Sequence, residues 1–401
     1  MRLIAVALLV APVRMLRAPP TFTMDLSVAP VQRWKGALAS VLRQHPWEYS
    51  FLPIFTQHNA SLFSRLPLRA WNVLTASLDT FYPDHAAELR GIAAEFAAHG
   101  HADVTFQYLA GWVWFHELAH TDVVDDSARH GSARECTAML ARDMVGNTLH
   151  VGNMDQQPPA VRNATLRVRF IDGNGTIMFE GVDWYWFTTG VSRAVRAGVA
   201  SMQENWRQGV PIPLQAMLDR ISGGSGQAVP QMFVFRHMLL LTPQPKFREL
   251  ASLVERVPLA APFYAVLAGP AGDGVIMARN ETHSEGTDWL GGHSAGALGD
   301  VLVQTNYDRW LPDSRADPRR TRAESMLTSI LGSARGLRSP PTEVDLFAVA
   351  SAYPIHNPHT AYTAVMNPVT GQLSAYVRDS LCPVRSAIRD LDTRYCASEP
   401  Y

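Results

Sequence analysis

The pattern of apolar residues changes once along this chain, close to Cys136, and this change limits the folds that the chain can adopt. Between residues 30 and 120, apolar side chains recur every three or four residues, which is typical of helices. After Cys136, polar and apolar residues alternate in short segments that end in tight turns, which is typical of strands. The sequence therefore predicts a helical N-terminal region followed by antiparallel strands and helices in an α+β layered fold.

Three of the strand segments predict β-hairpins. The first turns at Gly173-Asn174-Gly175, a sequence that favours a tight connection between two strands. The three hairpins are expected at residues 165–181, 263–280 and 361–379. Helical patterns lie between them, near residues 211–221, 229–256 and 318–333.

The composition excludes several classes of protein. The 401 residues include 35 lysines and arginines and 36 aspartates and glutamates, and the net charge of −1 argues against nucleic-acid binding. Charged residues make up 18% and apolar residues 47%, so the chain can bury a large core and is not intrinsically disordered. No apolar run reaches the roughly 18 residues of a membrane-spanning helix.

The N-terminus, the sequons and the cysteines favour the secretory pathway. Arg2 precedes an apolar run at residues 3–11 that has the size of a signal-peptide core, although the same run fits a buried strand. Cys382 and Cys396 could pair in an oxidising compartment, which would leave Cys136 as a free thiol. Four Asn-X-Ser/Thr triplets are candidate glycosylation sites, at Asn59, Asn163, Asn174 and Asn280. We therefore expect a signal peptide at residues 1–18 and a lysosomal or secreted protein.

The sequence His-Glu-Leu-Ala-His at residues 116–120 is the first candidate for chemistry. On a helix, His116 and His120 would face one side and could bind one zinc ion, with Glu117 beside them as a general base. A catalytic zinc ion needs a third protein ligand, and nothing in the sequence marks one. The alternative is that the two histidines pack at the end of a helix.

Cys136 is the second candidate. It begins a strand-like run, and Asn153 and Asp155 in an expected turn, HVGNMD, could be its partners. A free thiol can act as a nucleophile when it is ionised, whereas a small buried cysteine that only packs is the commoner case. The residues alone leave both interpretations open.

Two blocks of the sequence resemble a known family. Residues 136–155, CTAMLARDMVGNTLHVGNMD, are similar to the opening of the mature catalytic chain in the acid ceramidase and N-acylethanolamine-hydrolysing acid amidase family. Its members are N-terminal-nucleophile cysteine hydrolases, related to the choloylglycine hydrolases. TNYDRW at residues 305–310 and DPRRT at residues 317–321 resemble a second family block at matching spacing. Weaker similarity extends from about residue 19 to about residue 383.

The resemblance implies an αββα four-layer sandwich of antiparallel sheets and a precursor that cuts itself immediately before its nucleophile. Cleavage would fall between Glu135 and Cys136. It would give a helical α chain from residues 19–135 and a catalytic β chain from residues 136–401, and the two chains would stay associated.

The resemblance also implies roles for five residues. Cys136 would supply the nucleophilic thiolate and, once cleavage frees it, the α-amine that shuttles the proton. Asp155 would orient the amine and the thiol, and the side-chain amide of Asn306 would stabilise the oxyanion. Arg319 would support the site. Glu204 matches an acidic residue that is tied to self-cleavage.

The family hydrolyses lipid N-acyl amides of the ceramide or N-acylethanolamine type, so a lipid amide is the expected partner, and we expect no cofactor and no metal ion. Tyr307 and Trp310 accompany Asn306 and are candidate substrate-binding residues, or they pack around it. The aromatic segment from Trp47 to Trp71 is a candidate membrane-facing lip, or it packs as ordinary helices.

The chain departs from the family pattern at three places, one of which is that Cys396 lies further beyond Cys382 than the family pattern suggests. Gly152 stands where the family has an arginine near the nucleophile, so a cation that would help to lower the pKa of the thiol is missing. The chain could therefore be a weakened or non-catalytic lipid-binding relative. His116-Glu117 stands where the family has a tyrosine-glutamate pair, and an added polar segment separates it from Cys136. This correspondence accounts for the two histidines without zinc.

Overall fold

The computed structural model describes residues 16–124, 136–209, 211–223, 227–292, 299–312, 317–332 and 340–378. The apolar run at residues 3–11, Glu135, Cys382 and Cys396 lie outside the described residues, and so do the predictions that rest on them. None of the described helices is long and apolar enough to cross a membrane.

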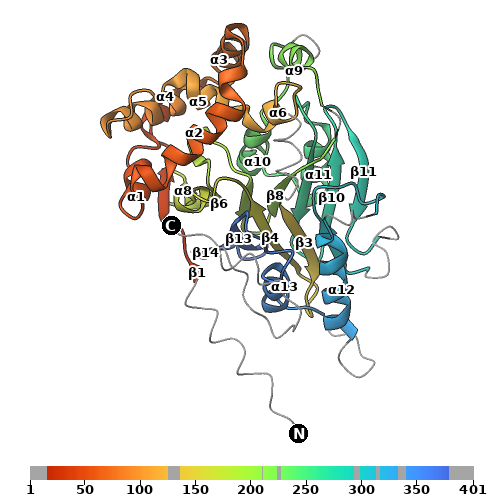
Figure 1. Ribbon diagram of the computed structural model, residues 1–401. Helices are drawn as coiled ribbons and strands as arrows, with labels where there is room; N and C mark the ends of the chain where they lie inside the picture. The colour runs from red at the N-terminus through yellow and green to blue at the C-terminus, as the bar shows by residue number, and fades with distance from the viewer. Residues whose placement is uncertain are drawn as a thin grey trace, which may run out of the picture.

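Two large β-sheets form the centre of the molecule (Figure 1). The six-stranded sheet has the order β1 (Leu16–Arg17), β14 (Gln372–Arg378), β13 (Thr360–Asn367), β4 (Thr148–Asp155), β3 (Thr137–Arg142) and β12 (Val301–Gln304). The eight-stranded sheet has the order β11 (Ser284–Trp289), β10 (Gly274–Arg279), β9 (Phe263–Ala268), β8 (Ala200–Trp206), β7 (Arg193–Arg196), β6 (Ile177–Asp183), β5 (Leu166–Ile171) and β2 (Thr21–Asp25). Neighbouring strands run antiparallel, except that β2 lies parallel to β5.

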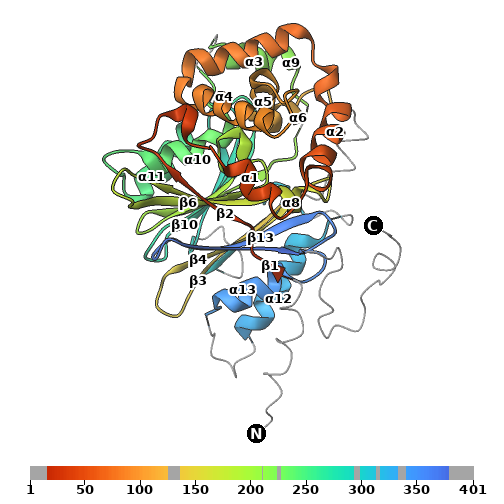
Figure 2. The same cartoon turned by 90° about the vertical axis from the view of Figure 1, so that its left-hand side faces the viewer.

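The sheets lie face to face, with helices on both outer sides (Figure 2). The six-stranded sheet packs on α12 (Arg319–Gly332) and α13 (Glu343–Ala350). The other sheet is covered by α10 (Gln231–Leu240), α11 (Phe247–Arg256) and the N-terminal helices (Figure 2). These are α1 (Ala37–Leu42), α2 (Phe51–Ser61), α3 (Leu68–Phe81), α4 (Pro83–Ala98), α5 (Phe106–Val113) and α6 (Phe115–Ala119). The remaining helices and 3₁₀ turns are α8 (Val161–Ala164), α9 (Leu214–Ile221), η2 (Pro30–Gln32), η3 (Trp47–Tyr49), η4 (Phe63–Arg65) and η5 (Trp186–Thr188).

The alternation of residues along β3 shows how the layers are built. Ala138 and Leu140 pack against residues of β9 and β10 in the opposite sheet. Met139 and Ala141 point the other way, into the cluster formed with α12 and α13. Successive side chains of a strand point to opposite faces, and here both faces are covered, so apolar residues occupy both.

The three hairpins predicted from the sequence are confirmed. They correspond to the antiparallel pairs β5·β6, β9·β10 and β13·β14. At the first turn, Gly175 adopts a φ of 80°, in the left-handed region that glycine enters at little cost. The helical region before residue 120 and the overall α+β class are also confirmed.

The N-terminal region packs onto the sheets through aromatic side chains. Trp34 stacks on Trp186 with the ring centroids 5.7 Å apart, and Phe51 meets Phe187 edge-on at 6.0 Å. A buried ion pair joins Glu88 of α4 to Arg236 of α10 at 2.6 Å. Residues before and after Cys136 therefore share one core.

Most of the aromatic segment from Trp47 to Trp71 takes part in that packing. Phe51, Phe55 and Phe63 are buried, and Trp47 stacks on His101 with the centroids 3.5 Å apart. The large apolar side chains of this segment that remain exposed are those of Tyr49, Leu52 and Leu68.

Candidate active site

Cys136 begins the segment that leads into β3 and is almost fully buried. Its Sγ lies 3.6 Å from Sδ of Met154 on the neighbouring strand β4. Its φ of 54° falls in the left-handed region, where a residue with a side chain is strained by roughly 1–2 kcal/mol. The backbone at Cys136 is therefore held in a conformation that its own side chain disfavours.

The guanidinium of Arg319, at the start of α12, connects the residues that the family resemblance singles out. Nη1 donates to the carbonyl oxygen of Cys136 at 3.1 Å and to Oδ2 of Asp155 at 3.2 Å. Nη2 donates to Oδ1 of Asn306 at 2.9 Å. Nε and Nη2 also bind the carboxylate of Asp317 at 2.7 and 2.6 Å. The structure thus brings Cys136, Asp155, Asn306 and Arg319 together, although up to 183 positions separate them along the chain.

The carboxylate of Asp155 is fixed by two further partners that motif comparison missed. Thr360 donates its hydroxyl to Oδ1 at 2.6 Å, and Asn357 donates its amide to Oδ2 at 2.8 Å. Burial raises the pKa of Asp155, while the charge of Arg319 and these two hydrogen bonds act to lower it. Both oxygens are therefore satisfied, and Asp155 can hold a fixed position at the end of β4.

Asn306 follows β12 and is almost fully buried. Its Oδ1 accepts from Arg319, and its Nδ2 donates to the carbonyl oxygen of Trp206 at 2.7 Å. A side-chain amide carries two N–H bonds, so one remains to donate to a developing oxyanion. These two contacts fix the direction of that remaining bond.

Glu204 of β8 lies beside the helical region. Its Oε1 is 3.3 Å from Nε2 of His116, and both side chains are buried. Burial raises the pKa of Glu204, but its hydrogen bond to His116 and the charges of His116 and Arg193 bring it below its ordinary value. Glu204 is therefore ionised and linked to a residue that precedes Cys136.

The other residues of the His-Glu-Leu-Ala-His sequence have packing roles in the described part of the chain. Oε1 of Glu117 accepts from the backbone N–H of Gln231 at the first position of α10, at 2.7 Å, and so caps that helix. The ring of His120 stacks on Trp206 with the centroids 4.8 Å apart. Among the described residues, no group of three His, Cys, Asp or Glu side chains is placed to hold a metal ion.

Burial dominates the electrostatics of the thiol and raises the pKa of Cys136 to about 12. The charges of Glu204 and Asp155 raise it further, whereas the charge of Arg193 and a hydrogen bond from that side chain lower it. Arg193 lies on β7 of the opposite sheet and is fully buried. The sequence analysis missed this arginine because no motif contains it.

Gly152, where the family arginine is missing, faces the opposite sheet at close range. A Cβ atom at this position would lie 2.0 Å from Oε1 of Gln203. Gln203 is held in place because its Nε2 donates to the carbonyl oxygen of Thr137 at 3.0 Å and to Oδ1 of Asn205 at 2.7 Å. With Gln203 in this position, there is no room for a side chain at residue 152.

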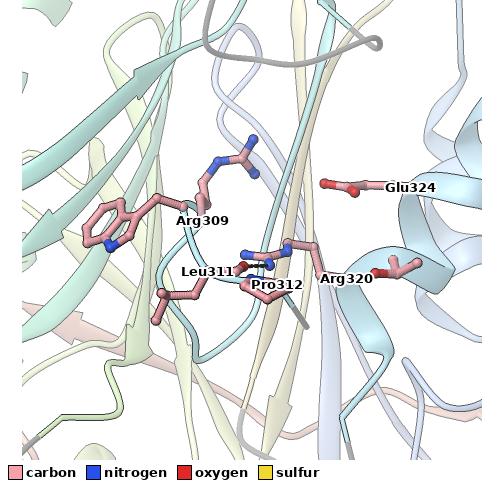
Figure 3. A pocket seen from close by; sticks show the side chains of 7 residues that line it. Arg309, Leu311, Pro312, Arg320 and Glu324 are labelled. Carbon is pink, nitrogen blue, oxygen red and sulfur yellow. Dashed lines mark hydrogen bonds between the residues drawn. The ribbon is translucent and has the colours of Figure 1, made fainter. Parts of the chain in front are cut away.

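Trp310 lines a surface pocket of about 550 Å³ between residues 309–312 and the first turns of α12 (Figure 3). It is 53% exposed, and its ring packs on Gly286 and lies 5.7 Å from the guanidinium of Arg207. The remaining lining residues are Arg309, Leu311, Pro312, Arg320, Thr321 and Glu324. Tyr307 is half-buried, and its carbonyl oxygen accepts from Gln304 at 2.9 Å. Trp310 therefore combines packing with an open face, whereas the contact given for Tyr307 is a hydrogen bond to its backbone carbonyl oxygen.

The four sequons differ in how their asparagines are placed. Asn59 on α2 and Asn174 in the β5–β6 turn are exposed. Asn163 is half-buried and donates to the carbonyl oxygen of Tyr49 at 2.7 Å. Asn280 is also half-buried, and its Oδ1 accepts from the backbone N–H of His283 at 2.8 Å. Asn59 and Asn174 are therefore the more accessible of the four candidate sites.

Comparison with known proteins gives a consistent result. No family model matches the chain. It is 26% identical over 368 residues to an N-acylethanolamine-hydrolysing acid amidase of Caenorhabditis elegans. The match covers 91% of this chain and 93% of that protein. It is 25% identical over 264 residues to human acid ceramidase, with 62% of each chain covered. A solved structure of a C. elegans N-acylethanolamine-hydrolysing acid amidase ortholog superposes with a TM-score of 0.50 at 26% identity, covering 60% of this chain and 99% of that one. The chain is therefore a homologue of the N-acylethanolamine-hydrolysing acid amidases and acid ceramidases.

Proposed function

We propose that this protein is a self-processing cysteine amidohydrolase that cleaves the amide bond of a lipid N-acyl amide, of the ceramide or N-acylethanolamine type. The products would be a fatty acid and an amine. The observation that carries the proposal is the position of Arg319, which hydrogen-bonds Cys136, Asp155 and Asn306 at once. The names of the homologues, all amidases, support the same class of reaction.

The layered arrangement supports assignment to the N-terminal-nucleophile hydrolases. Two largely antiparallel sheets face each other between helices, and Cys136 immediately precedes β3, which lies between β4 and the edge strand β12 of the six-stranded sheet. A nucleophile at the start of a strand becomes a chain terminus if the preceding bond is cut. Its α-amine can then accept the proton of its own thiol, since such an amine titrates near pH 8.

Self-cleavage would begin when the thiol of Cys136 attacks the carbonyl carbon of Glu135. The peptide nitrogen would leave as the free α-amine of Cys136, and water would hydrolyse the resulting thioester. The left-handed backbone of Cys136 supports this step, because cleavage would release the strain held there. Ionised Glu204, held by His116, is a candidate to take a proton from the attacking water or thiol, because its charge acts on the Cys136 thiol.

Hydrolysis of the substrate would use the same atoms. The thiolate of Cys136 would attack the amide carbonyl carbon, and the resulting oxyanion would accept a hydrogen bond from the remaining side-chain N–H of Asn306. The C–N bond would then break as the α-amine returns its proton to the leaving amine. Water would hydrolyse the thioester to the fatty acid and restore the thiol. Asp155, held by Thr360 and Asn357, would position the α-amine through these steps.

A lipid substrate requires apolar surface, because each CH₂ group removed from water contributes about 0.8 kcal/mol. Exposed Trp310 and Leu311, which follow Asn306 in the chain, offer apolar surface in the pocket of Figure 3, although its lining also includes Arg309, Arg320 and Glu324. We place membrane contact at exposed Tyr49, Leu52 and Leu68. We also assign the protein to the lysosome or the secretory pathway, as its relationship to acid ceramidase suggests.

Trypsin digestion and mass spectrometry provide a direct test of self-cleavage. Trypsin cuts after Arg134 and Arg142, so the intact chain gives the peptide Glu135–Arg142 and the processed chain gives Cys136–Arg142. We expect the shorter peptide from the wild type at acidic pH, and none from Cys136→Ala.

A fluorogenic N-acyl amide would then measure hydrolysis. Amidase activity that appears with the shorter peptide and disappears in Cys136→Ala supports the proposal. Activity that persists in Cys136→Ala and is lost with a zinc chelator would instead indicate a metal site at His116 and His120. An intact chain that binds the lipid amide without hydrolysing it would identify a non-catalytic relative.

A further inference from the structure

The space between the two sheets beneath Cys136 contains an arginine whose charge no described carboxylate pairs directly. Nη2 of Arg193 donates to the carbonyl oxygen of Asn153 at 2.8 Å. Nη1 lies 3.4 Å from the hydroxyl groups of Tyr362 and of Ser192. All three of these partners are neutral, and Nε has no described hydrogen-bond partner. A fully buried cation in this state is costly unless an anion comes close to it.

The pairing of the strands places the side chain of Arg193 near Cys136, the proposed nucleophile. Asn153 pairs with Thr137, the residue after Cys136, so the guanidinium reaches the backbone of β4 beside the start of β3. Gln203, directly opposite Arg193 in the eight-stranded sheet, reaches the carbonyl oxygen of Thr137 in the same direction. Both side chains therefore project from the eight-stranded sheet into the layer in which the thiol lies.

The other charged and titratable groups near the thiol do not supply a free cation. Arg319 is balanced by the carboxylates of Asp155 and Asp317. His150 is neutral, because burial and the charge of Arg193 lower its pKa to about 3. Glu204 and Asp155 oppose ionisation of the thiol, and the hydroxyl group of Tyr185 is un-ionised because burial raises its pKa. Arg193 is thus the cation available to a thiolate at Cys136.

We propose that Arg193 is a catalytic residue that stabilises the thiolate of Cys136 from the opposite sheet, and so replaces the cation that is absent at Gly152. The proposal rests on the proposed role of Cys136 as the nucleophile. Gln203 blocks the place from which a side chain at residue 152 would enter the layer. Arg193 enters that layer from β7 and needs no space at β4. When the thiol ionises, its proton passes to the α-amine, and the negative charge on Sγ meets the guanidinium.

The experiment measures the thiol directly and does not require amidase activity. The full-length protein is alkylated with iodoacetamide from about pH 5 to pH 10, and the alkylation rate of Cys136 is followed by mass spectrometry on its tryptic peptide. Where burial holds the midpoint above this range, as in uncleaved chains, a shift of the midpoint is measured as the ratio of alkylation rates at one pH. That peptide reports separately on uncleaved chains, as Glu135–Arg142, and on cleaved chains, as Cys136–Arg142. Variants are compared with the wild type in the same state of cleavage.

Arg193→Met and Arg193→Gln remove the charge, and the glutamine can still donate to the carbonyl oxygen of Asn153. We expect both to raise the pH midpoint of alkylation by at least about one unit, which is about a tenfold lower alkylation rate at any pH below the midpoint. Arg193→Lys keeps a cation and should shift the midpoint less. Arg196→Met is the matched control, because Arg196 lies on the same strand and binds Gln244 at 2.7 Å, away from the thiol.

An unchanged midpoint in either folded neutral variant would overturn the proposal and leave Arg193 with a packing role only. The use of two neutral variants keeps the test decisive if one of them fails to fold. A raised midpoint in a protein without amidase activity would uphold the interaction between Arg193 and Cys136 while refuting the proposed hydrolysis. A raised midpoint together with at least a tenfold loss of amide hydrolysis would uphold both.

Discussion

Nε2 of His116 lies 3.3 Å from Oε1 of Glu204, and this contact connects the two sides of the proposed cleavage junction. His116 belongs to the helical region before Cys136, whereas Glu204 lies on a strand of the sheet region after it. The contact therefore allows a residue of the N-terminal region to influence the charge of a carboxylate that acts on the proposed nucleophile, Cys136.

His116→Phe should move the acidic limit of self-cleavage to higher pH. His116 lowers the pKa of Glu204, and without it burial raises that pKa with less opposition. The carboxylate would then take up a proton at a higher pH and lose its ability to act as a base. The fraction of cleaved chain, measured on denaturing gels from about pH 4 to pH 7, reports this shift. His116→Gln keeps a donor but not the charge, so it should shift the profile less than His116→Phe. Identical profiles for all three proteins would contradict the prediction.

Arg319→Met should destabilise the fold by about 3–5 kcal/mol, because it leaves the buried carboxylates of Asp155 and Asp317 without their cation. Urea unfolding followed by circular dichroism measures the loss. Arg322→Met is a suitable control, since Arg322 is half-buried on the same helix and should matter by less than about 0.5 kcal/mol. Equal stability of the two variants would refute the central position that we give to Arg319.

Gly152→Ala should cost about 1–3 kcal/mol, because its Cβ would overlap Oε1 of Gln203. In the double variant Gly152→Ala/Gln203→Ala the overlap disappears. Its loss of stability should therefore be smaller than the sum of the losses of the two single variants, by about 0.5–3 kcal/mol. Thermal unfolding of all four proteins measures this coupling. Gly209→Ala, with open space around its Cβ, should be neutral. Simple additivity would show that Gln203 does not fill the position of a side chain at residue 152.

Glu88→Gln should make the free energy of unfolding depend less strongly on pH in the acidic range. Burial raises the pKa of Glu88, but Arg236, Trp34 and Arg33 lower it below its ordinary value of about 4.3. A carboxylate with a lowered pKa stabilises the fold above the pKa of the unfolded chain, and this contribution is lost as the pH falls through the pKa of the folded state. The difference in the free energy of unfolding between the wild type and the variant should therefore shrink as the pH falls below about 4.3.

At neutral pH the wild type should exceed Glu88→Gln by about 3–5 kcal/mol, since the buried arginine then has a charged partner. Urea midpoints at pH 7 and near pH 3 test both parts of the prediction. A constant difference between the two proteins at all pH values would show that Glu88 is not the titrating group.

Local sequence was enough to predict the hairpins but not the assembly of the sheets. The turn at Gly173-Asn174-Gly175 is encoded within a few residues. The turn expected at HVGNMD is wrong, because Thr148–Asp155 forms one continuous strand, β4. Gly152 and Asn153 favour a turn locally, but pairing with β3 on one side and β13 on the other overrides that preference. The pairing of β2 with β5 joins segments about 145 positions apart, and no local pattern specifies such a partner.

The candidate site divides in the same way. Cys136, Asp155, Asn306 and Arg319 lie in blocks with fixed spacing, and comparison with a family pattern found them. Thr360, Asn357 and Arg193 were missed, because each reaches the site from a separate element and stands in an unremarkable stretch of sequence. The proposal that Arg193 compensates for Gly152 depends on the opposed positions of the two sheets, which no local sequence pattern specifies.

The position of β2 has a consequence for the fate of the two pieces after processing. β2 comes from before the junction and runs along β5, and β1 likewise extends the other sheet beside β14. Backbone hydrogen bonds in both sheets would therefore still join the fragments once the peptide bond is gone. The fragments should co-elute in gel filtration until global unfolding, and neither, when produced alone, should reconstitute a soluble enzyme, because each would present bare strand edges and an uncovered aromatic surface.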